Sequence, residues 1–206
     1  MTACTVAIPE AEVRAGPPPP SPDWDEAGTQ APVDLSELVV GFVDLAGSTA
    51  LAARVPTPDF ARAMVRFRSI ATATVEGWGG RLVKVVGDGA LFLAPDASTA
   101  AAVAFALIAA CAGRPELPAL RGGLAGGEVV LDGDDCFGLA VNLAAKSAAL
   151  ARPGSVVATR AVVDELGDAG TCAPGAALPG VLLGHLPAFV ELFELDRSEF
   201  ASRTSA

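Results

Sequence analysis

The 206-residue chain is acidic and apolar: its net charge is −10, 51% of its residues are hydrophobic, and it has one histidine. A chain of this length supports one domain with a sizeable core and an additional segment. Because it has no basic cluster, it lacks the electrostatic footprint of a nucleic-acid-binding protein. No apolar run reaches the roughly 20 residues that a membrane-spanning helix requires, so we expect no membrane partner.

The N-terminus and the cysteines predict a cytoplasmic protein. The first residues, MTACTVAIPEAEV, lack the basic region and the long apolar region of a signal peptide. None of the cysteines stands in a CxxC pair, which favours a reducing compartment over a disulfide scaffold or a zinc site. The four are Cys4, Cys111, Cys136 and Cys172.

Residues 1–37 are proline-rich and polar, which is typical of a flexible linker or tail. A strand is predicted at 37–45, and small and hydroxyl residues then lead into a short helix at 46–55. The next helix has apolar residues at spacings of three and four from Phe60 to Val75. Two strands, 81–86 and 90–94, are joined by a Gly-Asp-Gly turn, and Asp96 is the predicted N-cap of an alanine-rich helix.

The second half continues this alternation. A strand with glycine breaks is predicted at 117–131, and a helix at 137–151 that ends at an Arg-Pro-Gly sequence. A short strand (155–159), a short helix (160–167) and a final strand pair (180–195) follow. Helices that alternate with strands and one tight hairpin predict an α/β or α+β fold rather than an all-parallel sheet. The sequence has no GxxxxGK[ST] motif, which excludes a P-loop nucleotide site.

Two acids stand where predicted strands end. Asp88 lies between Gly87 and Gly89 in the hairpin, and Asp44 ends the first strand. Each has a purely structural alternative, since Asp-Gly is a strong hairpin signal and Asp44 could cap the following helix. If the strands are neighbours, however, the two carboxylates face each other and repel unless cations lie between them. That arrangement suits a two-metal site for phosphoryl chemistry.

Four motifs occur in register along the chain: FVDLAGST, KVVGDGALF, RGGLAGGEVV and DCFGLAVNLAAK. Together they resemble the catalytic domain of class III nucleotidyl cyclases, the adenylate and guanylate cyclase family, from about Leu38 to Leu195. The resemblance implies a ferredoxin-like βαββαβ core with extra C-terminal strands, paired head-to-tail as a homodimer with two composite active sites. Residues 38–196 would form the catalytic domain and 197–206 a C-terminal tail. The segment before the core is similar to the link that precedes it in some actinobacterial adenylate cyclases.

The resemblance also assigns site residues. Asp44 and Asp88 match the two metal-binding aspartates, which implies two divalent cations, Mg²⁺ or Mn²⁺. Arg121 matches a triphosphate-binding arginine, and Asn142 matches a residue that orients the ribose. The backbone of a triphosphate cradle would run through Leu45, Ala46, Gly47, Ser48 and Thr49. Lys84 and Asp135 match the pair that selects the purine, and the partner chain would supply them, with Asn142, to the metals of the first chain.

The chemistry of the purine pair favours ATP as the substrate. A lysine donates and an aspartate accepts, and adenine offers an acceptor at N1 and a donor at N6. The alternatives, a solvated strand lysine for Lys84 and a turn acid for Asp135, stay open at this point. The implied reaction is attack of the ribose 3′-hydroxyl of ATP on the α-phosphorus, which yields 3′,5′-cyclic AMP and pyrophosphate.

Two positions depart from the family pattern. Lys146 stands where an arginine is usual, so the charge is kept and the planar, bidentate fork is lost. Leu183 stands where a phosphate-binding lysine is usual; His185 could replace it in part, although a surface or core histidine is the alternative. We therefore expect an adenylate cyclase of low turnover. The rival hypothesis is a catalytically degenerate cyclase-fold module for nucleotide binding or dimerisation.

Overall fold

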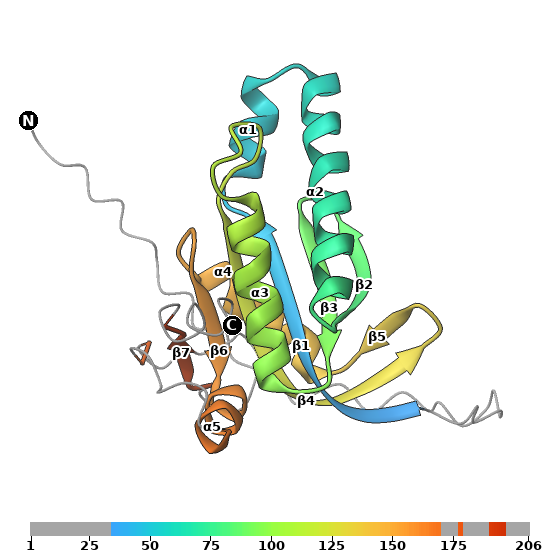
Figure 1. The fold of residues 1–206 in the computed structure, drawn as a ribbon, viewed down its shortest axis with the longest axis vertical. Coiled ribbons are helices and arrows are strands. Elements are labelled where there is room, and N and C mark those ends of the chain that lie inside the picture. The colour runs from blue at the N-terminus through green and yellow to red at the C-terminus, as the bar shows by residue number, and fades with distance from the viewer. Residues whose placement is uncertain (1–33, 170–176, 179–189, 197–206) are drawn as a thin grey trace, which may run out of the picture. The chain divides into compact units, whose positions relative to one another are not determined.

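The computed structural model describes residues 34–169, 177–178 and 190–196 (Figure 1). Seven strands form one sheet in the order β2-β3-β1-β4-β6-β7, and β5 pairs with β4 outside this path. The first half of the chain forms β1 (Asp34–Leu45), α1 (Ser48–Arg54), α2 (Thr57–Gly77), β2 (Arg81–Val86), β3 (Gly89–Ala94) and α3 (Ala97–Cys111). The second half forms β4 (Leu120–Asp132), β5 (Asp135–Phe137), α4 (Leu139–Leu150), β6 (Val156–Thr159), α5 (Arg160–Asp168) and β7 (Leu192–Glu194).

The connectivity is that of a split βαβ core. β1 lies between β3 and β4 and is antiparallel to both, and β2 is antiparallel to β3. β6 then runs parallel to β4, and β7 runs antiparallel to β6. The prediction of a ferredoxin-like core with extra C-terminal strands is therefore confirmed.

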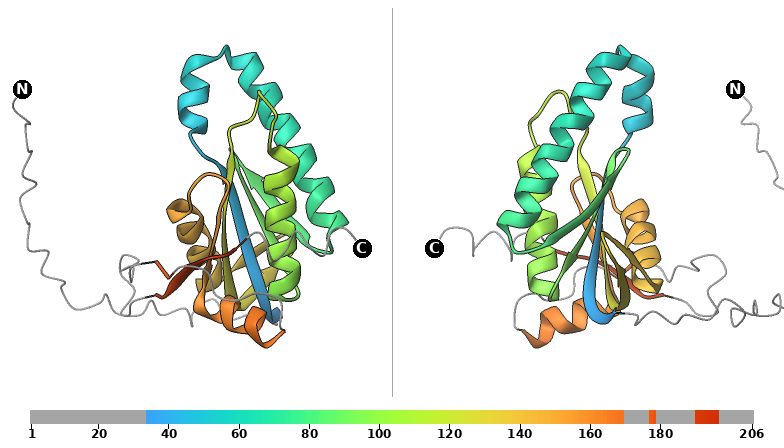
Figure 2. Two further views of the ribbon diagram at one scale, coloured as in Figure 1. Left: turned by 60° about the vertical axis from the view of Figure 1, so that its left-hand side comes forward. Right: turned by 90° about the vertical axis from the view of Figure 1, so that its right-hand side faces the viewer.

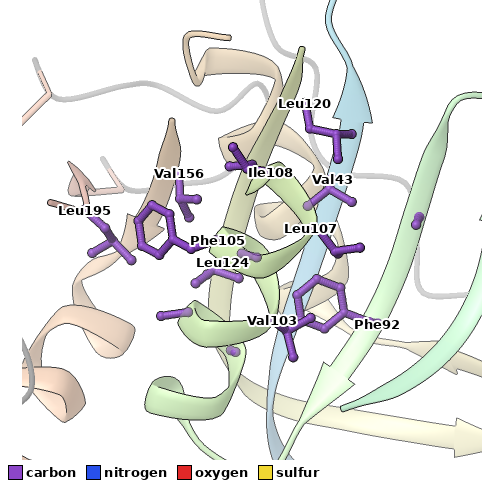
Figure 3. Packing of buried hydrophobic residues seen from close by; sticks show 14 of the residues in the cluster. Val43, Phe92, Val103, Phe105, Leu107, Ile108, Leu120, Leu124, Val156 and Leu195 are labelled. Carbon is purple, nitrogen blue, oxygen red and sulfur yellow. The ribbon is translucent and has the colours of Figure 1, made fainter. Parts of the chain in front are cut away.

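Helices cover both faces of the sheet, as Figure 2 shows, with α2 and α3 on one face and α4 on the other. The α3 face holds the larger core, in which Val43, Phe92 and Leu124 of the sheet pack against α3 (Figure 3). The α4 face holds a smaller cluster that includes Val40 and Ala144. Because side chains alternate along a strand, Asp44 follows Val40 and Phe42 onto the α4 face.

The alanine-rich run predicted as a buried helix is α3. Nine of its fifteen residues are buried, which explains why the run is apolar on nearly every side. Asp96 is its N-cap, as predicted, and accepts a hydrogen bond from the Thr99 amide at 2.7 Å. Among the described residues, no helix is both long enough and apolar enough to cross a membrane.

Two differences from the predicted elements, at β1 and at β5, follow from the pairing of strands with β4. β1 begins at Asp34 rather than at residue 37, because its N-terminal part pairs with the far end of β4. β5 was not predicted: its residues read as a turn, but they fold back on β4 through Asp132 and Asp135. Of the predicted C-terminal strand pair, only β7 is described, and residues 180–189 lie outside the described ranges.

One of two adjacent glycines, Gly123, lets α4 lie directly on β4. A Cβ atom placed on Gly123 would be 2.1 Å from the carbonyl oxygen of Ala144 and 2.2 Å from the amide of Ala148. A Cβ on Gly122, on the opposite face, would be in ordinary contact with the side chains of Val43 and Val156, at 3.4 and 3.5 Å, and with the carbonyl oxygen of Phe42 at 3.8 Å. The glycine-rich sequence of β4 is thus required for the approach of α4.

We expect Gly123→Ala to lower the free energy of unfolding by about 3 kcal/mol or more, because the added methyl group meets helix backbone that cannot move aside. Gly122→Ala is the matched control and should leave stability unchanged or raise it by up to about 1 kcal/mol. Urea unfolding followed by circular dichroism measures both. Equal stability of the two variants would show that α4 is not packed this closely on β4.

Candidate functional site

Asp44 and Asp88 come from adjacent strand ends, as predicted. Asp44 pairs with Gly89 across β1 and β3, which places it beside the turn that carries Asp88. The Leu45 amide donates to the Asp88 carbonyl at 3.2 Å and closes this end of the strand pair. Both acids are partly buried. The sheet register alone therefore brings two carboxylates to one site.

Arg121 is the cationic partner of Asp44. It lies directly opposite Asp44 in the antiparallel register of β1 and β4. Its Nε donates to Oδ1 of Asp44 at 2.8 Å and its Nη2 donates to Oδ2 at 3.0 Å, a bidentate pair. Its Nη1 donates to the carbonyl of Ala149 near the end of α4, at 2.7 Å. The hydrogen bonds to Asp44 raise the pKa of Arg121, and the charge of Asp88 adds to this shift.

Asp88 has a neutral partner instead. Its Oδ2 accepts a short hydrogen bond from the Ser48 hydroxyl, which stands at the start of α1. Ser48 is 8% exposed. Gly47, which precedes it, has φ = +82°, a left-handed conformation that glycine adopts without strain, and it is the N-cap of α1. The predicted cradle residue Ser48 therefore also fixes the carboxylate of Asp88.

Two of the five residues predicted for the phosphate cradle have backbone amides that donate within the protein. The amide of Leu45 donates to Asp88, and that of Ala46 donates to the Ala119 carbonyl at 2.9 Å. These two amides already have acceptors, so Gly47, Ser48 and Thr49 are the remaining candidate donors. They lie where the first amides of a helix have no acceptor within the helix itself.

Lys84 and Asp135 form a pair within one chain. Lys84 Nζ lies 2.6 Å from each carboxylate oxygen of Asp135. A bulge between Leu82 and Lys84 sets Lys84 opposite Leu91, so its side chain leaves β2 on the α4 face rather than the α3 face. Nearby, Arg81 Nη2 donates to the Gly133 carbonyl at 2.9 Å. Lys84 and Asp135, which the sequence analysis assigned to one pair, thus bond to each other in the structure.

The charge of Lys84 acts directly on Asp135. Hydrogen bonds from Lys84 lower the pKa of Asp135, and the amide of Cys136, which donates to the same carboxylate at 2.8 Å, contributes to the shift. Both side chains of the pair are more than one-third exposed. A ligand in solution can therefore reach the donor and the acceptor together.

The remaining predicted residues fall into two groups. Asn142 and Lys146 are exposed on α4, one turn apart, so they share a face of the helix. Leu183 and His185 lie outside the described residues. Within the described ranges, no cluster of three or more His, Cys, Asp or Glu residues could hold a metal ion. Any metal at this site would depend on the two carboxylates of Asp44 and Asp88.

Sequence reasoning missed three contacts: Arg121 with Asp44, Ser48 with Asp88, and Arg81 with the β4–β5 turn. Each joins residues at least 40 positions apart, so no local pattern signals it. The opposite charges of Asp44 and Arg121, each near a predicted strand end, were the only available hint. Pairing them requires the register of β1 and β4, which the sequence leaves open.

Known proteins similar to this chain are adenylate cyclases and cyclase domains. An adenylate cyclase of Streptomyces coelicolor is 36% identical over 141 residues, which is 68% of this chain and 37% of that protein. One of Streptomyces griseus is 38% identical over 127 residues, 62% of this chain and 32% of its own length. The match thus spans about a third of the length of these curated relatives.

The fold is shared with a solved cyclase. The adenylyl cyclase CyaB of P. aeruginosa superposes with a TM-score of 0.71 at 16% identity, over 81% of this chain and 96% of the other. No protein-family model matches the sequence. The sequence match is thus to adenylate cyclases, and the fold is that of a solved adenylyl cyclase.

We expect Lys84→Met to raise the pKa of Asp135 toward its ordinary value, because the cation that stabilises the carboxylate is removed. A pH titration followed by the ¹³C shift of the Asp135 carboxyl carbon measures this. Arg152→Met, which removes a cation paired with Glu194, should leave the titration of Asp135 as in the wild type. An identical curve in Lys84→Met would mean that the ion pair does not form in solution.

Proposed function

We propose that this chain, which belongs to the class III nucleotidyl cyclase family, is the catalytic domain of an adenylate cyclase that converts ATP to 3′,5′-cyclic AMP and pyrophosphate. The observation that carries the proposal is the pair Asp44 and Asp88, held together where the end of β1 adjoins the β2–β3 turn. Homology to adenylate cyclases that bear this name supports it.

The donor set at these strand ends suits divalent cations. Carboxylate and hydroxyl oxygens are hard ligands, the type that Mg²⁺ and Mn²⁺ prefer. The guanidinium of Arg121 already lies against Asp44, so the position accepts positive charge. Asp44 and Asp88 would hold two such ions, which when bound lower the pKa of the attacking hydroxyl and offset the charge of the phosphates.

The other residues bind and orient the nucleotide. Arg121 and the amides of Gly47, Ser48 and Thr49 would bind the triphosphate, as donors to its oxygens. Asn142 would orient the ribose, and Lys146 would place a positive charge near the α-phosphate. Because lysine offers a point charge rather than a planar fork, we propose a low turnover for this enzyme.

Lys84 and Asp135 would select adenine. In the free protein they satisfy each other, with Lys84 Nζ between the two oxygens of Asp135. Adenine supplies both replacements, since its N1 accepts from Lys84 and its N6 amino group donates to Asp135. Guanine presents the opposite pattern and would leave both side chains unpaired, which is the source of large discrimination.

The α4 face supports the proposed homodimer. The large side chains of Val86, on the same face of the sheet as Asp44, and of Leu139, on α4 itself, are 59% and 54% exposed. Six further apolar side chains pack against the small cluster of this face but are only partly buried: Leu38, Phe42, Val83, Leu131, Val141 and Leu143. Apolar surface of this kind marks an interaction site, and a twofold dimer would use the same surface on both copies. Each site would then take Asp44 and Asp88 from one copy and Lys84, Asp135 and Asn142 from the other.

We expect Asp44→Asn and Asp88→Asn each to reduce cyclic AMP formation from Mn²⁺-ATP by more than about 100-fold. A loss of this size is larger than the loss that follows when a residue that only supports a metal ligand is removed. Asp164→Asn is the control, because Asp164 is an exposed acid on α5 that pairs with Arg160. Circular dichroism verifies that the variants fold.

Two outcomes would contradict the proposal. Near-normal turnover in either folded variant would exclude Asp44 and Asp88 as the metal ligands. A wild type that binds Mn²⁺-ATP but forms no cyclic AMP would instead favour the catalytically degenerate module.

The shared sites predict complementation between inactive variants. Asp44→Asn and Asn142→Ala should each be inactive alone, but their heterodimer has one site with both residues intact. With free subunit exchange, about a quarter of the wild-type activity should return, since half of the dimers are mixed and each has one good site. Asp44→Asn mixed with Asp88→Asn is the matched control: both residues serve the same half of a site, so no activity should return. Equal recovery in the two mixtures, or recovery in neither, would exclude composite sites.

A further inference from the structure

We propose that Arg121 is an internal counter-ion of the metal site: it occupies Asp44 in the metal-free protein, and a divalent cation binds there by displacing it. This inference rests on the proposed function, because it takes Asp44 as a metal ligand. It goes beyond that function because it gives Arg121 a role before any nucleotide is bound.

The geometry makes Arg121 and a metal ion competitors for one carboxylate. Two parallel hydrogen bonds of 2.8 and 3.0 Å engage both oxygens of Asp44. Each oxygen keeps a further lone pair, but a divalent cation there would lie close to the guanidinium charge. The side chains of Arg121 and Asp44 are only 27% and 20% exposed, so solvent screens that repulsion incompletely. The two cations therefore exclude each other at Asp44.

Release of Asp44 cannot occur through loss of the proton on Arg121. A guanidinium group stays charged at any physiological pH. The guanidinium must therefore move away as a cation. Its Nη1 is bonded to the Ala149 carbonyl at 2.7 Å, which provides a second anchor about which the guanidinium can turn.

The two acids of the site are not equivalent. Asp44 is neutralised by a cation, whereas Asp88 accepts from the neutral hydroxyl of Ser48. Without Arg121 the two carboxylates would repel each other with no charge between them. Arg121 thus stabilises the metal-free protein and at the same time weakens metal binding, since the apparent dissociation constant rises as the fraction of free Asp44 falls. A residue that only supports the fold would not have these opposite effects.

The first test measures Mn²⁺ binding to the full chain by electron paramagnetic resonance, without nucleotide. Arg121→Gln should bind Mn²⁺ about tenfold more tightly than the wild type, because a charge-assisted pair no longer competes. Arg121→Lys should show a smaller gain, because it keeps the charge without the fork. Arg152→Gln is the control: it removes the same charge from a pair in which Nη2 of Arg152 donates to both carboxylate oxygens of Glu194, and should bind Mn²⁺ as the wild type does.

Thermal unfolding supplies the second readout. In EDTA, Arg121→Gln should unfold at a lower temperature than the wild type, and added Mn²⁺ should reduce the difference. Adding Asp44→Asn to Arg121→Gln should remove the gain in Mn²⁺ affinity, which would show that the effect passes through Asp44.

The third readout follows the arginine itself. On titration of the wild type with Mg²⁺, the Nε–H resonance of Arg121 should shift as its bond to Asp44 breaks. The Nε–H of Arg160, which donates to Glu191 at 3.1 Å, is an internal control and should not move.

The measurements distinguish failure of the counter-ion proposal from failure of the proposed metal site. If the wild type binds Mn²⁺ and both Arg121 variants bind it equally or more weakly, the counter-ion proposal is wrong and the metal site stands. An Arg121 resonance that stays unchanged at saturating Mg²⁺ would have the same meaning. If neither the wild type nor any Arg121 variant binds Mn²⁺, the metal site fails and the proposed function fails with it.

Discussion

The register of β1 between β3 and β4 is the constraint on which the site depends. β1 pairs with both neighbours in antiparallel register, so Asp44 stands beside Gly89 on one side and opposite Arg121 on the other. A shift of one residue in either pairing would turn the side chain of Asp44 to the opposite face. The buried residues of β1 prevent such a shift, because Val39 and Val43 belong to one core and Val40 to the other. Hydrophobic packing on two faces thus fixes the position of a polar group at the strand end.

The same sheet positions α4, which carries the remaining polar residues proposed for the site. Gly123 has no side chain to separate β4 from α4, so the backbone of α4 lies directly on the strand. Asn142 and Lys146 are then held on the exposed side of a helix that cannot move outward without opening a cavity. Arg121 joins both parts, since one guanidinium bonds to Asp44 on β1 and to Ala149 on α4. A change in the position of Arg121 therefore alters contacts with α4 as well as with the end of β1.

The elements that the sequence predicted well are those with a local pattern. The three- and four-residue spacing marked α2, the Asp96 cap marked the start of α3, and the Gly-Asp-Gly turn marked the β2–β3 hairpin. Contacts that depend on register or irregularity were not predictable in this way. Strict alternation along β2 would put Lys84 on the α3 face, and only the bulge beside it turns Lys84 toward Asp135. β5 was missed because it exists only by pairing with β4, and its three residues have no pattern of their own.

Two cations of the site face an acid of the same chain: Arg121 pairs with Asp44, and Lys84 with Asp135. In a chain with a net charge of −10, this arrangement keeps these two positive charges at the site, each beside an acidic partner. A ligand that binds here must exchange partners rather than add to them, so its affinity is a difference between two sets of hydrogen bonds. Only a ligand that offers a replacement to both members of a pair loses nothing in that exchange. A metal for Asp44 together with an anion for Arg121 meets this condition, and so does a base with one acceptor and one donor for Lys84 and Asp135. The ion pairs of the free protein therefore determine which ligands bind well. A ligand that bonds to only one residue of a pair leaves the other residue without a partner, and its affinity is lower for that reason.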